Sequence, residues 1–313
     1  MNIHKIVLPT PFPVGDVNVF LVKGEALTLF DAGPKTTEAY ETLKTGIRAA
    51  GYEMKDIDQV ILTHQHPDHA GWIDAFPKAN ILAHEYVDHW LRQKPEFLEY
   101  RDQFYQYHMI RQAVPERYIE KMLQIRGELE LLGTTPLTHF IQDGDEMPGH
   151  PGLKAHYTPG HAQSHLIFVD EKTNTAIGGD LLLETISSNP LIEPPIDLSM
   201  DRPKTLLQYH QSLTLLKDLN VSKLYTGHGN EIENVNELID FRIKRDHKRA
   251  KQAYDILSEP KTVYEVTQKL YASLYKSELG LTLSKTIGEL DYLEQEGLVK
   301  VELVGDVLIY SRT

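Results

Sequence analysis

The sequence predicts an α/β protein with a small additional domain of helices and a hairpin at its C-terminal end. Short β-rich runs alternate with helical patterns through most of the chain, and several of these runs end in polar clusters. After Pro260 the pattern changes to two helices followed by two strands, with Gly305-Asp306 as the turn. A length of 313 residues agrees with two domains of roughly 150 residues.

Composition excludes several classes of protein. Hydrophobic residues make up 41% and charged residues 25%, near the averages of globular proteins, which argues against disorder and collagen. The chain has no cysteine, which excludes thiol catalysis and cysteine-type zinc or iron–sulfur sites. No apolar run reaches the roughly 18 to 20 residues of a membrane span, and Pro9, Pro11 and Pro13 interrupt any signal-peptide core. We therefore expect a cytoplasmic protein without a membrane partner.

The net charge of the chain indicates which kind of substrate or partner it can bind. The net charge is −13, from 32 basic and 45 acidic residues. This charge repels polyanions, because non-specific nucleic-acid affinity comes mostly from Lys and Arg neutralising phosphates. A small-molecule substrate is therefore favoured over a nucleic acid, although a local basic groove would not be excluded by net charge. The sequence leaves the oligomeric state open, a homo-oligomer included.

The first elements follow from local patterns. Residues 17–22 and 27–30 are β-rich and are separated by a turn at 23–25, so they read as hairpin strands. Residues 36–50 carry apolar side chains at helical spacing, with Gly51 where a C-terminal cap belongs. Residues 59–63 form a short, mostly apolar run typical of a buried strand.

The remaining elements complete the alternation. From residue 84 to 132 the chain is predicted to be helical, with breaks at Pro95 and Pro115. Three further strands are predicted at 154–158, 166–169 and 175–178. A proline-rich irregular loop follows at 187–203, then a helix at 204–219 and a last strand at 223–226.

The C-terminal region is predicted to leave the first domain near residue 245. A basic helix at 242–251 leads out, and the helices and hairpin that follow have the layout of a winged helix. Such a domain could bind nucleic acid or pack against the catalytic domain or a partner subunit. Packing is favoured, because the helix around Ser284-Lys285-Thr286 continues into acidic residues that would meet phosphates badly.

A dense group of metal-binding residue types follows the predicted buried strand. The segment His64-Gln65-His66-Pro67-Asp68-His69 holds three imidazoles and a carboxylate. Zinc prefers imidazole nitrogen and carboxylate oxygen where no thiolate is present. Side chains two apart in an extended segment point the same way, so His64 and His66 can converge on one ion, while Asp68 and His69 turn aside toward a second. The alternative is a solvated histidine-rich loop, which rarely sits against a buried strand.

Three further candidates lie at the ends of predicted strands. His161 ends a TPGH motif, Asp180 closes a GGD motif, and His228 stands in a GHG motif whose glycines let the backbone approach closely. A lone histidine is more often structural. Three candidates at strand ends, beside a dense cluster, together indicate one metal site.

The order HxHxDH, TPGH, GD and GHG resembles that of the metallo-β-lactamase superfamily, with Asp31-Ala32-Gly33 as a fifth element. The resemblance covers roughly residues 1–245 and implies a four-layer αβ/βα sandwich with its site along one edge. The domain prediction is therefore a catalytic domain over 1–245, with a helical insert at about 84–132, and a winged-helix-like domain over 246–313.

The resemblance also implies the ligands of two zinc ions, with iron or manganese as alternatives for such a donor set. The first ion would be held by His64, His66 and His161. The second would be held by Asp68, His69 and His228, with Asp180 bridging both ions.

Two more residues are predicted to support these ligands. Asp31 would orient a ligand imidazole through its free ring nitrogen, or would be a turn residue only. His165 would support the site or pack within a strand.

The superfamily has several branches, and the motifs separate them. Asp180 groups the chain with thioesterases, lactonases and nucleases, since the true lactamases typically lack the bridging aspartate. Only 48 residues separate Asp180 from His228, so the large β-CASP nuclease domain is absent. Leu183 stands where acyl-homoserine lactonases carry a tyrosine, and the glutathione-binding stretch of glyoxalase II is not found.

Aromatic residues of the predicted insert are candidates for a substrate pocket over the metals. An apolar pocket of this kind would favour an apolar or aromatic acyl group; the alternative is that these residues are the core of the insert. The candidates are Tyr86, Trp90, Phe97, Tyr100, Phe104 and Tyr107.

These residues predict a metal-dependent hydrolase that cleaves a small ester, thioester or lactone. Two zinc ions would lower the pKa of water to about 7 and so make hydroxide available, with Asp68 and Asp180 as catalytic carboxylates. One alternative is an endoribonuclease of the lactamase-beta-like type, favoured by the domain layout. A second is a winged-helix regulator whose metal domain senses a ligand, which the intact ligand set opposes.

Overall fold

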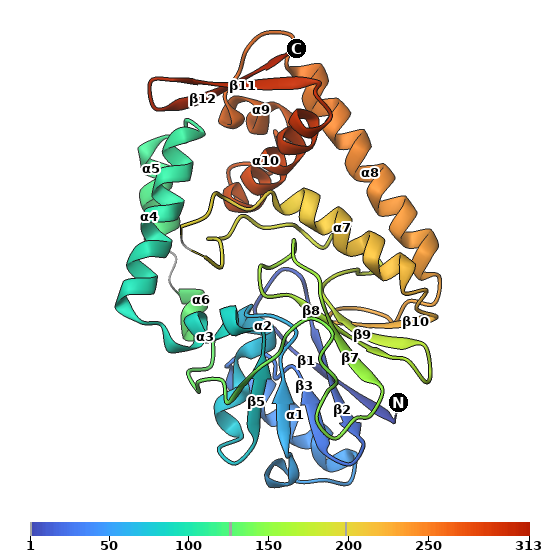
Figure 1. The fold of residues 1–313 in the computed structure, drawn as a ribbon. Helices are drawn as coiled ribbons and strands as arrows, with labels where there is room; N and C mark the ends of the chain where they lie inside the picture. The colour runs from blue at the N-terminus through green and yellow to red at the C-terminus, as the bar shows by residue number, and fades with distance from the viewer. Residues whose placement is uncertain (1, 125–126, 198) are drawn as a thin grey trace.

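The computed structural model describes residues 2–124, 127–197 and 199–313. Its body contains two sheets that face each other, with helices on the outer side of each (Figure 1). The first sheet is antiparallel through its first three strands and parallel from the third onward. Its strand order is β1 (Ile3–Leu8), β2 (Val17–Lys23), β3 (Leu27–Phe30), β4 (Gln59–Ile61), β5 (Asn80–Ala83) and β6 (His139–Phe140).

The second sheet lies against the inner face of the first. Three of its strands are antiparallel, and the strand at one edge runs parallel to its neighbour. Its order is β10 (Lys223–Thr226), β9 (Thr175–Gly179), β8 (Leu166–Asp170) and β7 (Leu153–Tyr157).

Some helices cover the outer faces of the two sheets. Others lie with the C-terminal hairpin above the sheets in Figure 1. The short 3-10 turns are η1 (Met54–Asp56) and η2 (Trp72–Ala75). The helices are α1 (Thr37–Ala49), α2 (Pro67–Ala70), α3 (Glu85–Arg92), α4 (Pro95–Arg111), α5 (Glu116–Gln124), α6 (Gly127–Glu130), α7 (Thr205–Asp218), α8 (Val235–Ile256), α9 (Val263–Leu270) and α10 (Leu279–Gln295). A separate hairpin of β11 (Val299–Val304) and β12 (Val307–Arg312) ends the chain.

The local sequence explains where α1 begins and ends. The Thr36 side chain accepts a hydrogen bond from the Ala39 backbone N–H, which caps the N-terminus. Leu43 and Ile47 face the first sheet and are buried. Gly51 follows the helix with a φ of +91°, a conformation that favours glycine.

Three apolar clusters establish the layers. Between the sheets, Phe30 and Ile61 of the first meet Phe168 and Ile177 of the second. The other face of the first sheet packs on α1 and α3. The other face of the second sheet packs on α7 and α8. This order of helix, sheet, sheet and helix confirms the predicted four-layer sandwich.

The predicted helices and strands are present, but three further strands were not predicted: β1, β5 and β6. β1 forms the antiparallel edge of the first sheet beside β2. β5 has four residues and β6 has two. Both extend the parallel side of the first sheet by pairing with a neighbour distant in sequence. Such short strands carry too few residues for a period-2 pattern to stand out.

The insert and the C-terminal region share one apolar cluster. Phe104 and Met109 of α4 pack with Val263 of α9 and with Leu283 and Ile287 of α10. Figure 1 shows α4 and α5 rising beside the C-terminal elements. The boundary at residue 245 stays a prediction, and α8 runs through that position without a break.

The predicted recognition segment of α10 is turned inward. Ser284 and Thr286 are buried, and Lys285 is half-buried. Farther along α10, Asp291 accepts two hydrogen bonds from Arg202, at 2.8 and 2.7 Å. This face of α10 therefore packs on the segment leading into α7 and is not presented to nucleic acid. The resemblance to a winged helix stays a prediction.

No helix within the described residues combines the length and the apolar character needed to span a membrane.

Candidate metal centre

The seven predicted ligands come together where strands of both sheets end. His64 and His66 follow β4, and Asp68 and His69 lie in α2, which Pro67 begins. The other three follow strands of the second sheet: His161 lies between β7 and β8, Asp180 directly follows β9, and His228 follows β10. The predicted strand ends therefore define one edge of the sandwich.

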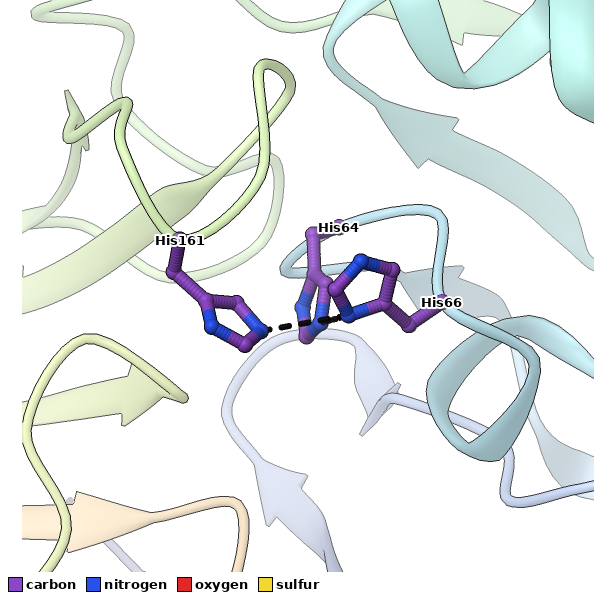
Figure 2. A group of neighbouring side chains, drawn as sticks. All are labelled: His64, His66 and His161. Carbon is purple, nitrogen blue, oxygen red and sulfur yellow. Dashed lines mark hydrogen bonds between the residues drawn. The ribbon is translucent and has the colours of Figure 1, made fainter. Parts of the chain in front are cut away.

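The first group of donors is compact. His66 Nδ1 lies 3.0 Å from His64 Nε2 and 3.1 Å from His161 Nε2. Figure 2 shows the three imidazoles pointing toward one another from separate loops. These three residues form a set whose ligand atoms all lie within 4.8 Å of one another, which is close enough to hold one metal ion.

The second group lies beside the first. Asp68, His69 and His228 form another set with ligand atoms within 4.8 Å of one another. In this set, His228 Nε2 lies 3.3 Å from Asp68 Oδ2. His69 also belongs to a set with His64 and Asp180.

Asp180 lies between the two groups. Its Oδ2 is 3.6 Å from His161 Nε2 and 3.5 Å from His228 Nε2. Its Oδ1 is 3.5 Å from His69 Nε2. One carboxylate therefore reaches donors of both groups, as a bridging ligand would.

The chemistry of the donors fits metal ions. Imidazole nitrogens and carboxylate oxygens are the ligands that zinc and related metals use when thiolates are absent. Three of these atoms, His69 Nε2, His228 Nε2 and Asp180 Oδ1, are buried and have no hydrogen-bond partner among the described residues. Buried polar atoms without partners are costly, and coordination would satisfy all three.

Asp31 contacts the ring nitrogen of His69 that faces away from the other ligands. Its Oδ2 accepts a hydrogen bond from His69 Nδ1 at 2.8 Å, and the Thr63 hydroxyl donates to the same carboxylate. Asp31 has a φ of +60°, a strained conformation for a residue other than glycine, and it lies at the turn that follows β3. Asp31 therefore has both the corner conformation and a contact with the His69 imidazole, and its role toward a metal ligand stays a prediction.

Three other imidazoles are held by the nitrogen that faces away from the centre. His64 Nδ1 is 2.9 Å from Thr63 Oγ1, whose proton is directed to Asp31. His228 Nδ1 donates to the Asp16 carbonyl at 2.7 Å, and His161 Nδ1 donates to the Asn189 carbonyl at 3.2 Å. These acceptors assign the proton to the outer nitrogen and leave the inner nitrogen free to bind a cation.

Glu193 was missed by the sequence reasoning. Its Oε1 lies 3.5 Å from His66 Nε2, the nitrogen opposite the one that faces the other ligands. The carboxylate also accepts hydrogen bonds from the Gln65 side chain and the Gln163 backbone N–H. Glu193 lies in the irregular loop 187–203 outside any motif, so the sequence carried no signal for this contact.

His165 supports Asp180 and lies outside the donor sets. Its Nδ1 contacts the Thr158 hydroxyl at 2.9 Å, and its Nε2 accepts a hydrogen bond from the Asp180 backbone N–H at 3.1 Å. Both ring nitrogens are therefore used, and His165 fixes the backbone from which the shared carboxylate projects.

The carboxylates dominate the electrostatics of the centre. Burial opposes protonation of His69, but Asp180, Asp31 and Asp68 raise its pKa well above the ordinary value. Burial also opposes protonation of His228, yet Asp180 raises its pKa to about 10. This part of the centre therefore favours positive charge, whether a proton or a metal ion supplies it.

Gly227 makes room for the shared carboxylate. A Cβ at this position would collide with Asp180 Oδ1 and come within 2.8 Å of His69 Cε1. The first glycine of the GHG motif therefore lets the backbone approach the Asp180 carboxylate closely, as the sequence analysis predicted for this motif.

A cavity of about 530 Å³ adjoins the centre and is lined at that end by His66, Gln65 and Glu193. Among the six aromatic candidates, Trp90 lines this cavity.

The other five aromatic candidates lie elsewhere, because helical turns point them to other sides. Tyr86 and Phe97 are buried in the core under the first sheet, and Phe104 is buried in the cluster with the C-terminal region. Tyr100 packs against that same cluster, and Tyr107 is exposed. None of these five is among the residues that line the cavity, and Tyr86, Phe97 and Phe104 have the core positions of the alternative interpretation.

Known proteins are similar to this chain in both sequence and fold. The model of the metallo-beta-lactamase superfamily matches residues 12–228. The probable metallo-hydrolase YqjP of Bacillus subtilis is 38% identical over 312 residues, covering 99% of this chain and 98% of that protein. The atrochrysone carboxyl ACP thioesterase of Aspergillus fumigatus is more distant, at 25% identity over 76% of this chain and 58% of that protein.

Solved structures agree with the fold over the full length. The metallo-beta-lactamase family protein TTHA1429 of Thermus thermophilus superposes with a TM-score of 0.81 at 25% identity, covering 99% of this chain and 98% of that one. A beta-lactamase domain protein of Burkholderia ambifaria gives a TM-score of 0.76 at 18% identity, covering 99% and 92%. With the His/Asp clusters at the edge of the four-layer fold, these matches establish that the chain belongs to the metallo-β-lactamase superfamily and is a metallo-hydrolase.

Proposed function

We propose that the protein is a hydrolase with two zinc ions that cleaves a small ester, thioester or lactone. The observation that carries this proposal is the position of Asp180, within 3.6 Å of donors of both groups. One group would be His64, His66 and His161, and the other Asp68, His69 and His228, with Asp180 shared. The same donors would also accept iron or manganese.

The side chains around the centre have distinct roles in this proposal. Bound metal ions would supply hydroxide from water at neutral pH and polarise the substrate oxygen. Asp31 and Glu193 hold His69 and His66 so that one nitrogen of each faces the centre. The Asp68 carboxylate, which is buried beside His228, would hydrogen-bond the attacking water and orient it.

Cleavage at a carbonyl is supported over cleavage of RNA. The thioesterase named above is a relative that acts on an acyl carrier thioester by its name. The net charge of −13 opposes a polyanionic substrate. The inward-facing segment of α10 also leaves the predicted nucleic-acid contact buried, which weighs against both the endoribonuclease and the regulator.

One assay separates these functions. The purified protein is analysed for bound metal and then tested against a thioester, a lactone and single-stranded RNA, with Asp180→Ala as the control. We expect hydrolysis of a carbonyl substrate that the substitution reduces by at least 100-fold, an order typical of removing a residue from a catalytic site. Cleavage of RNA alone, lost in Asp180→Ala, would establish the endoribonuclease. Tight duplex-DNA binding without hydrolysis would establish the regulator.

We also propose the cytoplasm as the compartment, the expectation drawn from the sequence.

A further inference from the structure

The cavity beside the metal centre extends far beyond it. One end is lined by Gln65, His66 and Glu193, and the other by residues of α4, α5 and α10. Its volume of about 530 Å³ lies within the range of about 300 to 1,000 Å³ typical of small-molecule sites. The cavity is therefore large enough for a substantial part of a substrate whose reacting group lies at the metals.

The far walls of the cavity are mainly apolar and come from distant parts of the chain. Met109 of α4 and Tyr118 of α5 line the side formed by the insert. Leu281, Leu283 and Ile287 of α10 line the opposite side. The C-terminal region is therefore a wall of the cavity that begins at the metal centre.

The charges around the cavity give no net attraction for an anionic occupant. Glu193 lies at the metal end, and at the exposed rim Glu278 is accompanied by Lys276 of opposite charge. Arg101 also lines the cavity, but Asp102 accepts a hydrogen bond from its guanidinium at 2.9 Å. Thiol carriers of acyl groups bear amides and phosphates, so the mainly apolar walls fit the acyl part better than the carrier.

We infer that this cavity binds the acyl chain of the substrate, and that the substrate is a medium-chain apolar acyl thioester or ester. The inference rests on the proposed hydrolase function. The carbonyl lies at the metal centre, the apolar chain lies between the insert and α10, and the leaving group points toward solvent. The C-terminal region thereby sets the chain length that the enzyme accepts.

The first test is a series of acyl substrates from acetyl to decanoyl with one constant leaving group. We expect kcat/KM to rise about fourfold for each added methylene, the factor that corresponds to burying one CH₂, until the cavity is filled. A kcat/KM that stays flat or falls along the series would overturn the inference.

The second test fills the cavity from α10. Leu281 lines the cavity but is half-buried and lies outside the apolar clusters, so Leu281→Trp leaves those clusters intact. We expect kcat/KM for the decanoyl substrate to fall at least tenfold more than kcat/KM for the acetyl substrate, and an unchanged melting temperature shows that the variant is folded. The matched control is Leu274→Trp, at a residue that is 50% exposed and outside the cavity lining. Equal effects on the acetyl and decanoyl substrates, or no effect on either, would contradict the inference.

A binding measurement separates failure of this inference from failure of the proposed function. Decanamide and acetamide, which are uncharged, are titrated into the chelator-treated protein by calorimetry. We expect decanamide to bind, acetamide not to bind, and Leu281→Trp to weaken decanamide binding at least tenfold. If decanamide binds in this way but no ester or thioester is cleaved, the cavity inference holds and the proposed function fails. If esters are cleaved but decanamide does not bind, the proposed function holds and the inference fails.

Discussion

Each imidazole of the metal centre is restrained at the nitrogen that faces away from the other ligands. The restraining groups differ: a carboxylate for His69, a hydroxyl for His64, and backbone carbonyls for His161 and His228. An imidazole whose outer nitrogen donates a hydrogen bond has a fixed ring orientation and a fixed tautomer. The donors are thus positioned before any ligand arrives, which lowers the entropic cost of binding one.

Glu193 is the restraint on His66, and its removal should weaken metal binding. Glu193→Gln keeps the shape of the side chain but removes the negative charge beside His66 Nε2. We expect metal affinity to fall by about 10-fold to 100-fold, the usual effect of losing a partner of a ligand histidine. Competition with a fluorescent chelator measures this affinity.

The matched control for this prediction is Glu184→Gln. Glu184 is exposed and accepts a hydrogen bond from Asn230 rather than from a predicted ligand. Its substitution should leave metal affinity unchanged. If Glu193→Gln binds metal as tightly as the control, Glu193 has no positioning role.

Among the elements, those that carry the site were the easiest to predict. β4 and β9 are short, apolar and end in polar motifs, so both the strand and the ligand after it stand out in the sequence. The chemistry of Asp180 and His228 is equally local, because each is marked by adjacent glycines.

Contacts between distant elements could not be predicted in the same way. The 3.5 Å approach of Glu193 to His66 joins a loop and a strand end that are far apart in sequence. The cavity wall of α10 depends on how the C-terminal region packs against the insert. Periodicity reports that a helix has an apolar face but does not identify the partner of that face, which is why the sequence could not separate the aromatic residue that lines the cavity from those that lie elsewhere.

α10 also carries a buried carboxyl that should make stability depend on pH. Glu289 is 3% exposed, and burial raises its pKa from the ordinary 4.5 to about 8, although the Tyr271 hydroxyl, Arg249 and Lys285 favour its ionised form and Asp246 opposes it. The folded protein therefore keeps this proton to a higher pH than the unfolded chain. Its contribution to stability is present below pH 4.5 and is lost as the pH rises through 8.

Glu289→Gln should remove this dependence, since the amide retains an acceptor for the Tyr271 hydroxyl, which lies 2.8 Å from Glu289 Oε1. We expect the wild-type free energy of unfolding to fall with pH by up to about 1.4 kcal/mol per unit between roughly pH 5 and 8, relative to the variant. Urea denaturation at several pH values measures this difference. Glu296→Gln, at the exposed end of the same helix, should follow the wild type. Parallel curves for wild type and Glu289→Gln would refute the prediction.

At the scale of the whole molecule, the metal centre joins the two sheets. His64 and His66 follow a strand of the first sheet, whereas His161, Asp180 and His228 follow strands of the second. Ions held by both groups would connect segments that the apolar layer between the sheets otherwise holds together alone. Unfolding would have to separate these ligands, so metal binding should stabilise the entire sandwich.

Removal of metal should therefore lower the melting temperature. At a free metal concentration 100 times the dissociation constant, a single site that binds only the folded state adds about 2.7 kcal/mol, which corresponds to a rise of several degrees in Tm. Calorimetric scans of the chelator-treated protein, with and without added Zn²⁺, measure this rise. Asp180→Ala removes the carboxylate that reaches both groups, so its Tm should respond far less to the same zinc concentration. A Tm that is independent of zinc in the wild-type protein, or an equal rise in Asp180→Ala, would mean that these side chains do not hold metal between the two sheets.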